Sequence, residues 1–129
     1  MLQAGSHENK PCLVGLARAI GVACVVALIV LSLLPAEDRP HTGAAGQNEH
    51  FIAYFGTAVF LALGYRTRIA RITTVCLLVG LAGVLEIIQR SIPGRHSQLI
   101  DWIASSTGAI FGIIAVALMA RLLRRFFAE

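Results

Sequence analysis

The chain has 129 residues, of which 57% are apolar and 14% charged, and its formal net charge is +4. About a quarter of the residues in a soluble domain are charged, and here the apolar residues form long blocks instead of amphipathic stripes, so a soluble globular domain is excluded. The arginines stand at the edges of these blocks, which argues against nucleic-acid binding and for membrane topology. The length fits a single domain over residues 1–129.

The first apolar block covers residues 12–34 and is interrupted only by Arg18. Its core is long enough to cross a bilayer, since an arginine side chain can snorkel to the interface. A cleaved signal peptide is the competing interpretation because Lys10 precedes the block. The block is longer than the usual hydrophobic region of a signal peptide and lacks a small-x-small cleavage site, so we expect a retained helix that Pro35 ends.

Three more apolar blocks follow, over residues 50–65, 72–89 and 99–120. The first of them is short for a span, and we expect it to draw in neighbouring loop residues. A short connection with Arg66, Arg68 and Arg71 separates the first two of these blocks, and a turn with Pro93 and Gly94 separates the last two. The expected fold is all-α, an integral membrane bundle of four transmembrane helices.

The distribution of basic residues predicts the orientation of this bundle. With the N-terminus inside, the cytoplasmic side would hold Lys10, Arg18, Arg66, Arg68, Arg71, Arg121, Arg124 and Arg125, and the outer side only Arg39, Arg90 and Arg95. This excess of basic residues on one side predicts that both termini are cytoplasmic. The expected location is the bacterial cytoplasmic (inner) membrane, with several passes.

The three cysteines, Cys12, Cys24 and Cys76, lie in or beside apolar blocks and have no CxxC spacing. We expect buried thiols and neither a disulfide nor a metal site. No motif indicates a cofactor.

Glu86 is a carboxylate near the end of an apolar helix, where an ionised group costs at least about 2.5–3.5 kcal/mol and is usually functional. In the predicted topology, the polar groups of three helices meet at the same, outer end of the bundle. They form a candidate polar pocket of His50, Tyr54, Glu86, Gln89, Arg95, Asp101 and Ser105.

Several members of this set have a simpler explanation. His50 would be tolerated at a membrane interface, and Tyr54 and Trp102 would suit an aromatic belt. Arg95 could bridge Glu86 and Asp101 as an ion pair, or it could present its guanidinium group to a phosphate. The sequence does not separate these two roles.

Small residues indicate where helices approach closely. Ala104, Gly108 and Gly112 are four residues apart, and Gly80 and Gly83 give the preceding helix a bare face below Glu86. Such faces allow close helix packing in lipid. We expect this packing to seat Glu86 against the last helix, near Asp101.

The arrangement resembles the VanZ-like family of small bacterial membrane proteins. In that family's pattern a histidine and a tyrosine open one helix, E-x-x-Q closes the next, an arginine follows in the loop, and D-x-x-x-N-x-x-G comes last. The matching residues here are His50, Tyr54, Glu86, Gln89, Arg95, Asp101 and Gly108. The chain departs from the pattern at Ser105, which replaces the asparagine, and at Gly46 and Gln47, where family members often have Asp-Lys.

The resemblance implies a cell-envelope setting, and the family is named after a protein linked to resistance against a teicoplanin-type glycopeptide antibiotic. The partner it suggests, besides the lipid bilayer, is a lipid-linked envelope precursor or a glycolipid. An outer-facing pocket would bind its head group through His50, Gln89 and Arg95, while Glu86 and Asp101 orient the arginine.

Three other roles remain open. The first is an enzyme acting on the same head group, with Glu86 or His50 as general base. The second is a small structural subunit of an envelope complex, and the third is a proton-coupled transporter, which would require an oligomer. A lipid phosphatase is rejected because the segment from Gln89 to Asp101 lacks the serine of that motif and places the aspartate one residue late.

Overall fold

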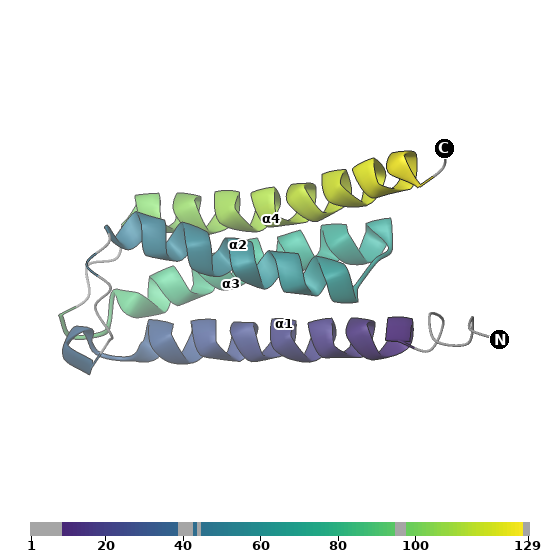
Figure 1. The fold of residues 1–129 in the computed structure, drawn as a ribbon. Coiled ribbons are helices and arrows are strands. Elements are labelled where there is room, and N and C mark those ends of the chain that lie inside the picture. Colours follow the sequence, from purple (N-terminus) through teal and green to yellow (C-terminus); the bar gives the residue numbers. More distant parts are fainter. Residues whose placement is uncertain (1–8, 39–42, 44, 95–97, 128–129) are drawn as a thin grey trace.

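The computed structural model describes residues 9–38, 43, 45–94 and 98–127. They form four α-helices, namely α1 (Asn9–Leu33), α2 (Gly46–Gly64), α3 (Arg68–Gln89) and α4 (Leu99–Phe126), and a short 3-10 helix, η1 (Ala36–Asp38). Successive helices run in opposite directions, so α1 begins and α4 ends at the same end of the bundle (Figure 1). The all-α prediction is confirmed for this part of the chain, in which no strand occurs.

The helix ends follow local chemistry more closely than hydropathy. α1 stops at Leu33 because the residue before Pro35 is disfavoured in the helical conformation. α3 begins four residues earlier than the apolar block, because the side chain of Thr67 caps it and accepts a hydrogen bond from the backbone N–H of Ala70 at 3.2 Å.

The other two helices also extend beyond their apolar blocks. α2 starts at Gly46 and so includes loop residues, as expected for a block too short to span. α4 continues to Phe126 through Arg124 and Arg125, since cations in the last turn interact favourably with the helix dipole.

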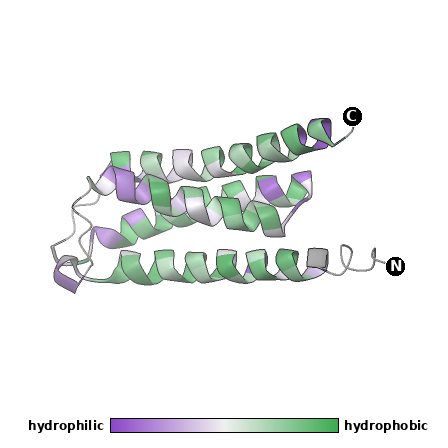
Figure 2. Cartoon of the chain, in the orientation of Figure 1, coloured by the Kyte–Doolittle hydropathy of each residue, from purple (hydrophilic) through white to green (hydrophobic). Residues whose placement is uncertain are grey.

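Three of the four helices, α1, α3 and α4, are long and apolar enough to cross a membrane. The 22 residues of α3 give about 33 Å of helix, against a hydrocarbon core of about 30 Å. α2 does not meet this criterion, because its first turns are polar (Figure 2). It packs against each of the other three helices, so its buried polar groups, including Tyr54 and Thr57, face protein.

The closest helix packing joins α2 to α4. Ala58 and Ala109 are fully buried between them, and a Cβ atom on Gly112 would come within 2.6 Å of the carbonyl oxygen of Phe55. A Cβ on Gly108 would collide with the carbonyl oxygen of Phe51. The small-residue face of α4 is therefore turned to α2, where it permits backbone contact.

Other small residues of the predicted packing faces lie in different surroundings. A Cβ on Gly83 would be 3.3 Å from Nε1 of Trp102, so this glycine faces α4. Nothing lies within 4 Å of the corresponding position at Gly80. Ala104 is half-buried on α4.

The cysteines are free thiols, but the expectation that they are buried is wrong for Cys12 and Cys76, which are exposed, and Cys24 is half-buried. Helices α1 and α3 lie at the outside of the bundle, and each turns part of its surface away from the other helices. Cys12 and Cys76 lie on these outward surfaces.

Candidate functional site

The candidate site lies at the end of the bundle where α2 and α4 begin and α3 finishes. Polar residues gather at this end of the described chain (Figure 2). Four of the predicted site residues are almost completely buried: Tyr54, Glu86, Gln89 and Ser105. The helices thus bring together predicted site residues that are up to 55 positions apart in the sequence, as for His50 and Ser105.

Glu86 lies on the inward face of α3, and its side chain is only 7% exposed. Its Oε1 atom accepts a hydrogen bond from the backbone N–H of Gln98, at 2.7 Å. Gln98 is the N-cap residue of α4, so the carboxylate is placed at the positive end of a helix dipole. This placement gives a physical reason why the chain tolerates an acidic group here.

Gln89 connects α3 to α1. Its side chain is 4% exposed, and its amide nitrogen donates to the carbonyl oxygen of Ser32 at 3.1 Å. Ser32 lies in the last turn of α1, where backbone carbonyl groups have no partner within the helix. The contact therefore fastens the end of α1 to the site.

His50 and Ser105 connect α2 to α4. The Nδ1 atom of His50 and the Oγ atom of Ser105 lie 3.4 Å apart, and the tautomer of the imidazole decides which atom donates. Ser105 is 2% exposed, whereas Asp101, one turn before it on α4, is half-buried with its Oδ1 atom enclosed. An imidazole, a hydroxyl and a carboxylate thus lie on neighbouring faces of two helices.

Tyr54 lies one turn below His50 on α2 and is 2% exposed. It lies close enough to Glu86 for an electrostatic interaction between the two side chains. Its burial in the bundle differs from the position of an aromatic-belt residue, which would face the lipid interface. Tyr54 forms part of the inner boundary of the polar cluster.

The structure does not describe every residue of the predicted pocket. Arg95 lies outside the described residues, so both of its alternative roles stay predictions. In the part of the chain that is described, no group of three or more His, Cys, Asp or Glu side chains could hold a metal ion.

Sequence reasoning missed three partners at this site. Ser32 and Gln98 contribute backbone atoms, and no side-chain pattern reveals backbone partners. Trp102 donates from Nε1 to the carbonyl oxygen of Val79 at 3.2 Å, which links α4 to α3. Gly83, one turn after Val79, leaves room for the indole of Trp102. In the sequence, the only indication of this contact was a glycine on one helix and a tryptophan on the next.

The site can bind polar groups and move protons. Glu86 and Asp101 are acceptors when ionised, the His50 ring can donate or accept, and Ser105 and Tyr54 carry hydroxyl groups. Because these groups lie among apolar helices, their interactions with a ligand would be little screened by water.

A comparison with known protein families matches VanZ/LLP1 over residues 25–121. No match was found among curated proteins or solved structures. The matched range contains every segment with the family's pattern, from His50 to Gly108, and it extends from the C-terminal part of α1 into the last turns of α4. Together with the three helices that are apolar enough to cross a bilayer, the match shows that this chain is a membrane protein of the VanZ/LLP1 family.

Proposed function

We propose that this protein is a multi-pass protein of the bacterial cytoplasmic membrane that binds the head group of a lipid-linked envelope precursor or a glycolipid. In this proposal all four helices cross the bilayer, both termini are cytoplasmic, and the polar cluster opens to the cell envelope. The bound lipid would connect the protein to glycopeptide resistance of the teicoplanin type.

The observation that carries the proposal is the burial of ionisable and polar side chains from three helices at one end of an otherwise apolar bundle. Packing alone does not require Glu86, Tyr54 and Ser105 to meet there, since apolar residues of similar size would fill the same space at lower cost. Such clusters are typical of sites that recognise a polar ligand inside a membrane. Of the two roles that the sequence leaves open for Arg95, this proposal takes the second, in which its guanidinium group binds a phosphate.

A structural role is the second candidate, and specific contacts favour it. Glu86 and Gln89 each satisfy a backbone group at the end of another helix, as residues that only fasten helix ends together would do. A structural subunit of an envelope complex would need these contacts and the hydrogen bond between His50 and Ser105, but it would not need positions 50 and 101 to carry ionisable groups.

The test measures variants of His50 and Asp101 in a strain that depends on the protein for glycopeptide tolerance or for survival of envelope stress. His50→Gln and Asp101→Asn, which keep hydrogen-bonding side chains and leave the Glu86 and Gln89 contacts intact, are expected to lower tolerance about tenfold or more while the protein still inserts. Thr73→Val, an exposed change on α3, serves as the matched control. Variants at His50 and Asp101 that behave like the control would exclude the binding site and leave the structural role.

A direct binding measurement separates a binder from an enzyme. Purified protein is incubated with a labelled lipid-linked precursor, and bound lipid and new products are measured in the same sample. Retention of unchanged lipid that the Asp101→Asn variant loses supports binding. A new product that requires Glu86 or His50 would instead identify an enzyme with one of them as general base.

A further inference from the structure

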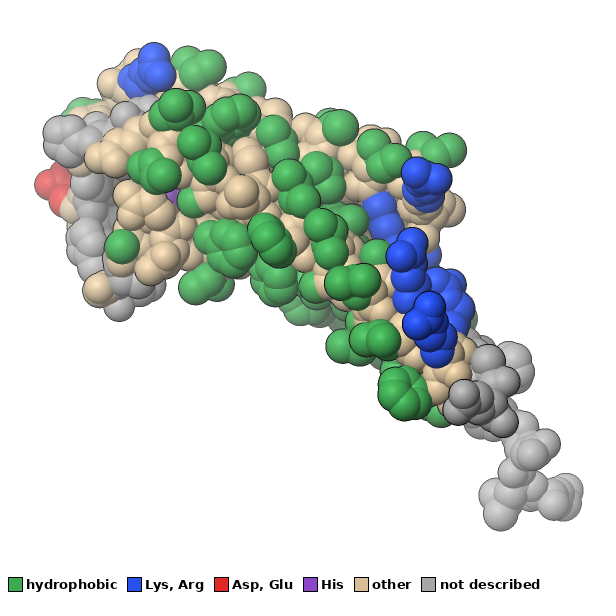
Figure 3. Space-filling model, turned by 90° about the horizontal axis from the view of Figure 1, so that it is seen from above, with side chains coloured by type: hydrophobic (Ala, Val, Ile, Leu, Met, Phe, Trp, Pro, Cys, Tyr) green, Lys and Arg blue, Asp and Glu red, His purple; other side chains and the backbone are tan. Residues whose placement is uncertain are grey.

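The opposite end of the bundle carries a concentrated positive charge. Six arginines lie there, around the start of α3 and the end of α4, and Figure 3 shows basic side chains gathered over this part of the surface: Arg66, Arg68, Arg71, Arg121, Arg124 and Arg125. The sequence has no Asp or Glu between residues 50 and 85 or between 102 and 128. Among the described residues of these two segments, the arginines therefore have no acidic partner.

Two apolar grooves converge on three of these arginines. One groove, of about 620 Å³, lies between α2 and α4, and the other, of about 680 Å³, lies between α3 and α4. Both are lined by Arg66, Arg71 and Arg124. Figure 1 shows that α4 diverges from α2 toward its C-terminal end, the end at which the α2/α4 groove lies.

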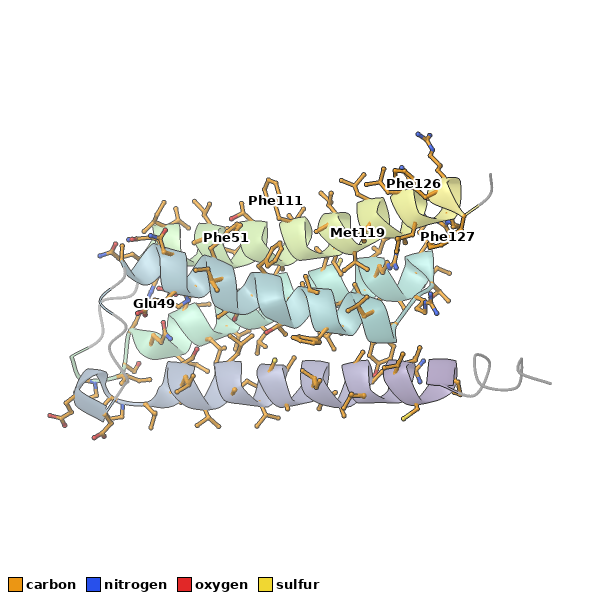
Figure 4. All side chains as sticks on the ribbon, in the orientation of Figure 1. Glu49, Phe51, Phe111, Met119, Phe126 and Phe127 are labelled. Atoms are coloured by element: carbon orange, nitrogen blue, oxygen red, sulfur yellow. The ribbon has the colours of Figure 1, made fainter. Side chains whose placement is uncertain are left out.

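The walls of the grooves away from the arginines suit hydrocarbon chains. All the other residues that line the α2/α4 groove are apolar, among them Phe55 and Met119, which is labelled in Figure 4. The α3/α4 groove has Ile72, Val75 and Ile114 below its arginines. Each groove is thus basic at the end of the bundle and apolar toward its middle.

The arginines of α3 are placed against the electrostatic preference of their own helix. Arg68 and Arg71 lie in or next to the first turn, which contains no acidic residue, and the helix dipole disfavours cations at this end. In addition, the Nε atom of Arg71 is buried and has no hydrogen-bond partner among the described residues. Membrane orientation requires basic residues on this side but does not require them in the first turn of a helix. A bound anion would offset the unfavourable interaction of these arginines with the helix dipole and would give the Nε atom of Arg71 a hydrogen-bond partner.

We propose that the junction of the two grooves at Arg66, Arg71 and Arg124 is a binding site for an anionic phospholipid. The guanidinium groups hold the phosphodiester, for which their paired N–H donors are suited, and the acyl chains lie along α4 in the apolar parts of the grooves. The site is at the other end of the bundle from the polar cluster, so it does not depend on the proposed function.

Lipid binding to the full-length protein tests this proposal. The protein is purified in a neutral detergent and titrated with phosphatidylglycerol or phosphatidylcholine of the same acyl chains, and the complexes are quantified by native mass spectrometry. Phosphatidylglycerol is expected to bind about tenfold more tightly. Its head group has a net negative charge that the arginines attract, whereas the choline cation of phosphatidylcholine neutralises the charge of its phosphate. Equal binding of the two lipids would overturn the proposal.

Paired variants locate the site. The double variant R71Q/R124Q is expected to lose the preference for phosphatidylglycerol, whereas R90Q/R125Q, which removes the same charge from exposed positions outside both grooves, is expected to keep it. Equal losses in the two double variants would show a diffuse charge effect and exclude this site.

A variant of the apolar wall tests the acyl chains separately. Ala120→Phe fills part of the α2/α4 groove and leaves all arginines in place, so it is expected to weaken phosphatidylglycerol binding several-fold. Helix content by circular dichroism and a monodisperse elution profile establish that each variant is folded. A folded Ala120→Phe protein with unchanged affinity would contradict the placement of the lipid along α4.

Discussion

At the scale of single residues, the polar groups of the cluster owe their position to backbone partners. Glu86 accepts from the N-cap residue of α4, and Gln89 donates to a carbonyl group at the end of α1. A backbone group at a helix end that is buried in the protein has little access to water, so one side chain that reaches it stabilises the junction of two helices. The sequence predicted that these two residues lie at the site and that Glu86 is seated against the last helix, but it did not predict the backbone atoms that they contact.

Gln89→Leu tests the value of such a contact. The change keeps the approximate size of the side chain and leaves the carbonyl oxygen of Ser32 without this donor, so we expect a loss of about 1–2 kcal/mol in unfolding free energy. Reversible unfolding in detergent micelles, followed by circular dichroism, measures the loss. Thr73→Val on the exposed side of α3 is the control, and a loss no larger than that of the control would mean that the bond contributes nothing.

At the scale of helices, the arrangement depends on which small residues meet a neighbour. Gly108 and Gly112 lie against backbone atoms of α2, whereas Gly80 faces open space on the surface of the bundle. These glycines look equivalent in the sequence, since each belongs to a stretch of small residues on an apolar helix. They differ only in whether the rotation of the helix about its axis points the glycine toward a neighbouring helix or away from the bundle.

Gly112→Ala and Gly80→Ala are expected to have opposite effects on stability. The added methyl group at Gly112 would overlap the carbonyl oxygen of Phe55 and force α4 away from α2, at a cost of about 1–3 kcal/mol. At Gly80 the same change removes backbone freedom from the unfolded chain and meets nothing, so stability should rise by up to about 1 kcal/mol. Thermal unfolding of the two variants in the same detergent checks this, and equal shifts of either sign would contradict the assigned faces.

At the scale of the whole molecule, α2 is the central helix, and this position explains its composition. It contacts all three other helices and buries Tyr54 and Thr57 against them, so it can be more polar than a helix that faces lipid. The arginine distribution predicts the orientation of the bundle, and crossing of the membrane by α2 is part of the same prediction.

Insertion of a reporter enzyme that is active only outside the cytoplasm tests both points. Insertion after Gly43 should give activity, and insertion after Thr67 or fusion after Arg125 should give none, because basic residues are retained on the cytoplasmic side. An active reporter after Thr67 would show that α2 does not cross the membrane. An active reporter after Arg125 would overturn the orientation.

The sequence by itself determined the all-α fold, the approximate helix positions and the end of the bundle at which polar residues gather. These features follow from the length of the apolar blocks and from the position of the polar residues between them, which are local properties of the chain. The sequence also carried the family pattern, because that pattern consists of residue types at fixed spacings from His50 to Gly108.

Only the tertiary structure decided which groups meet. The contact of Glu86 with the start of α4, the packing of Gly112 on α2 and the convergence of two grooves on Arg71 depend on how each helix is rotated and how far α4 diverges from α2. Hydropathy varies little around α1, α2 and α4, so it does not fix the rotation of these helices. Side-chain packing against the neighbouring helices fixes it instead.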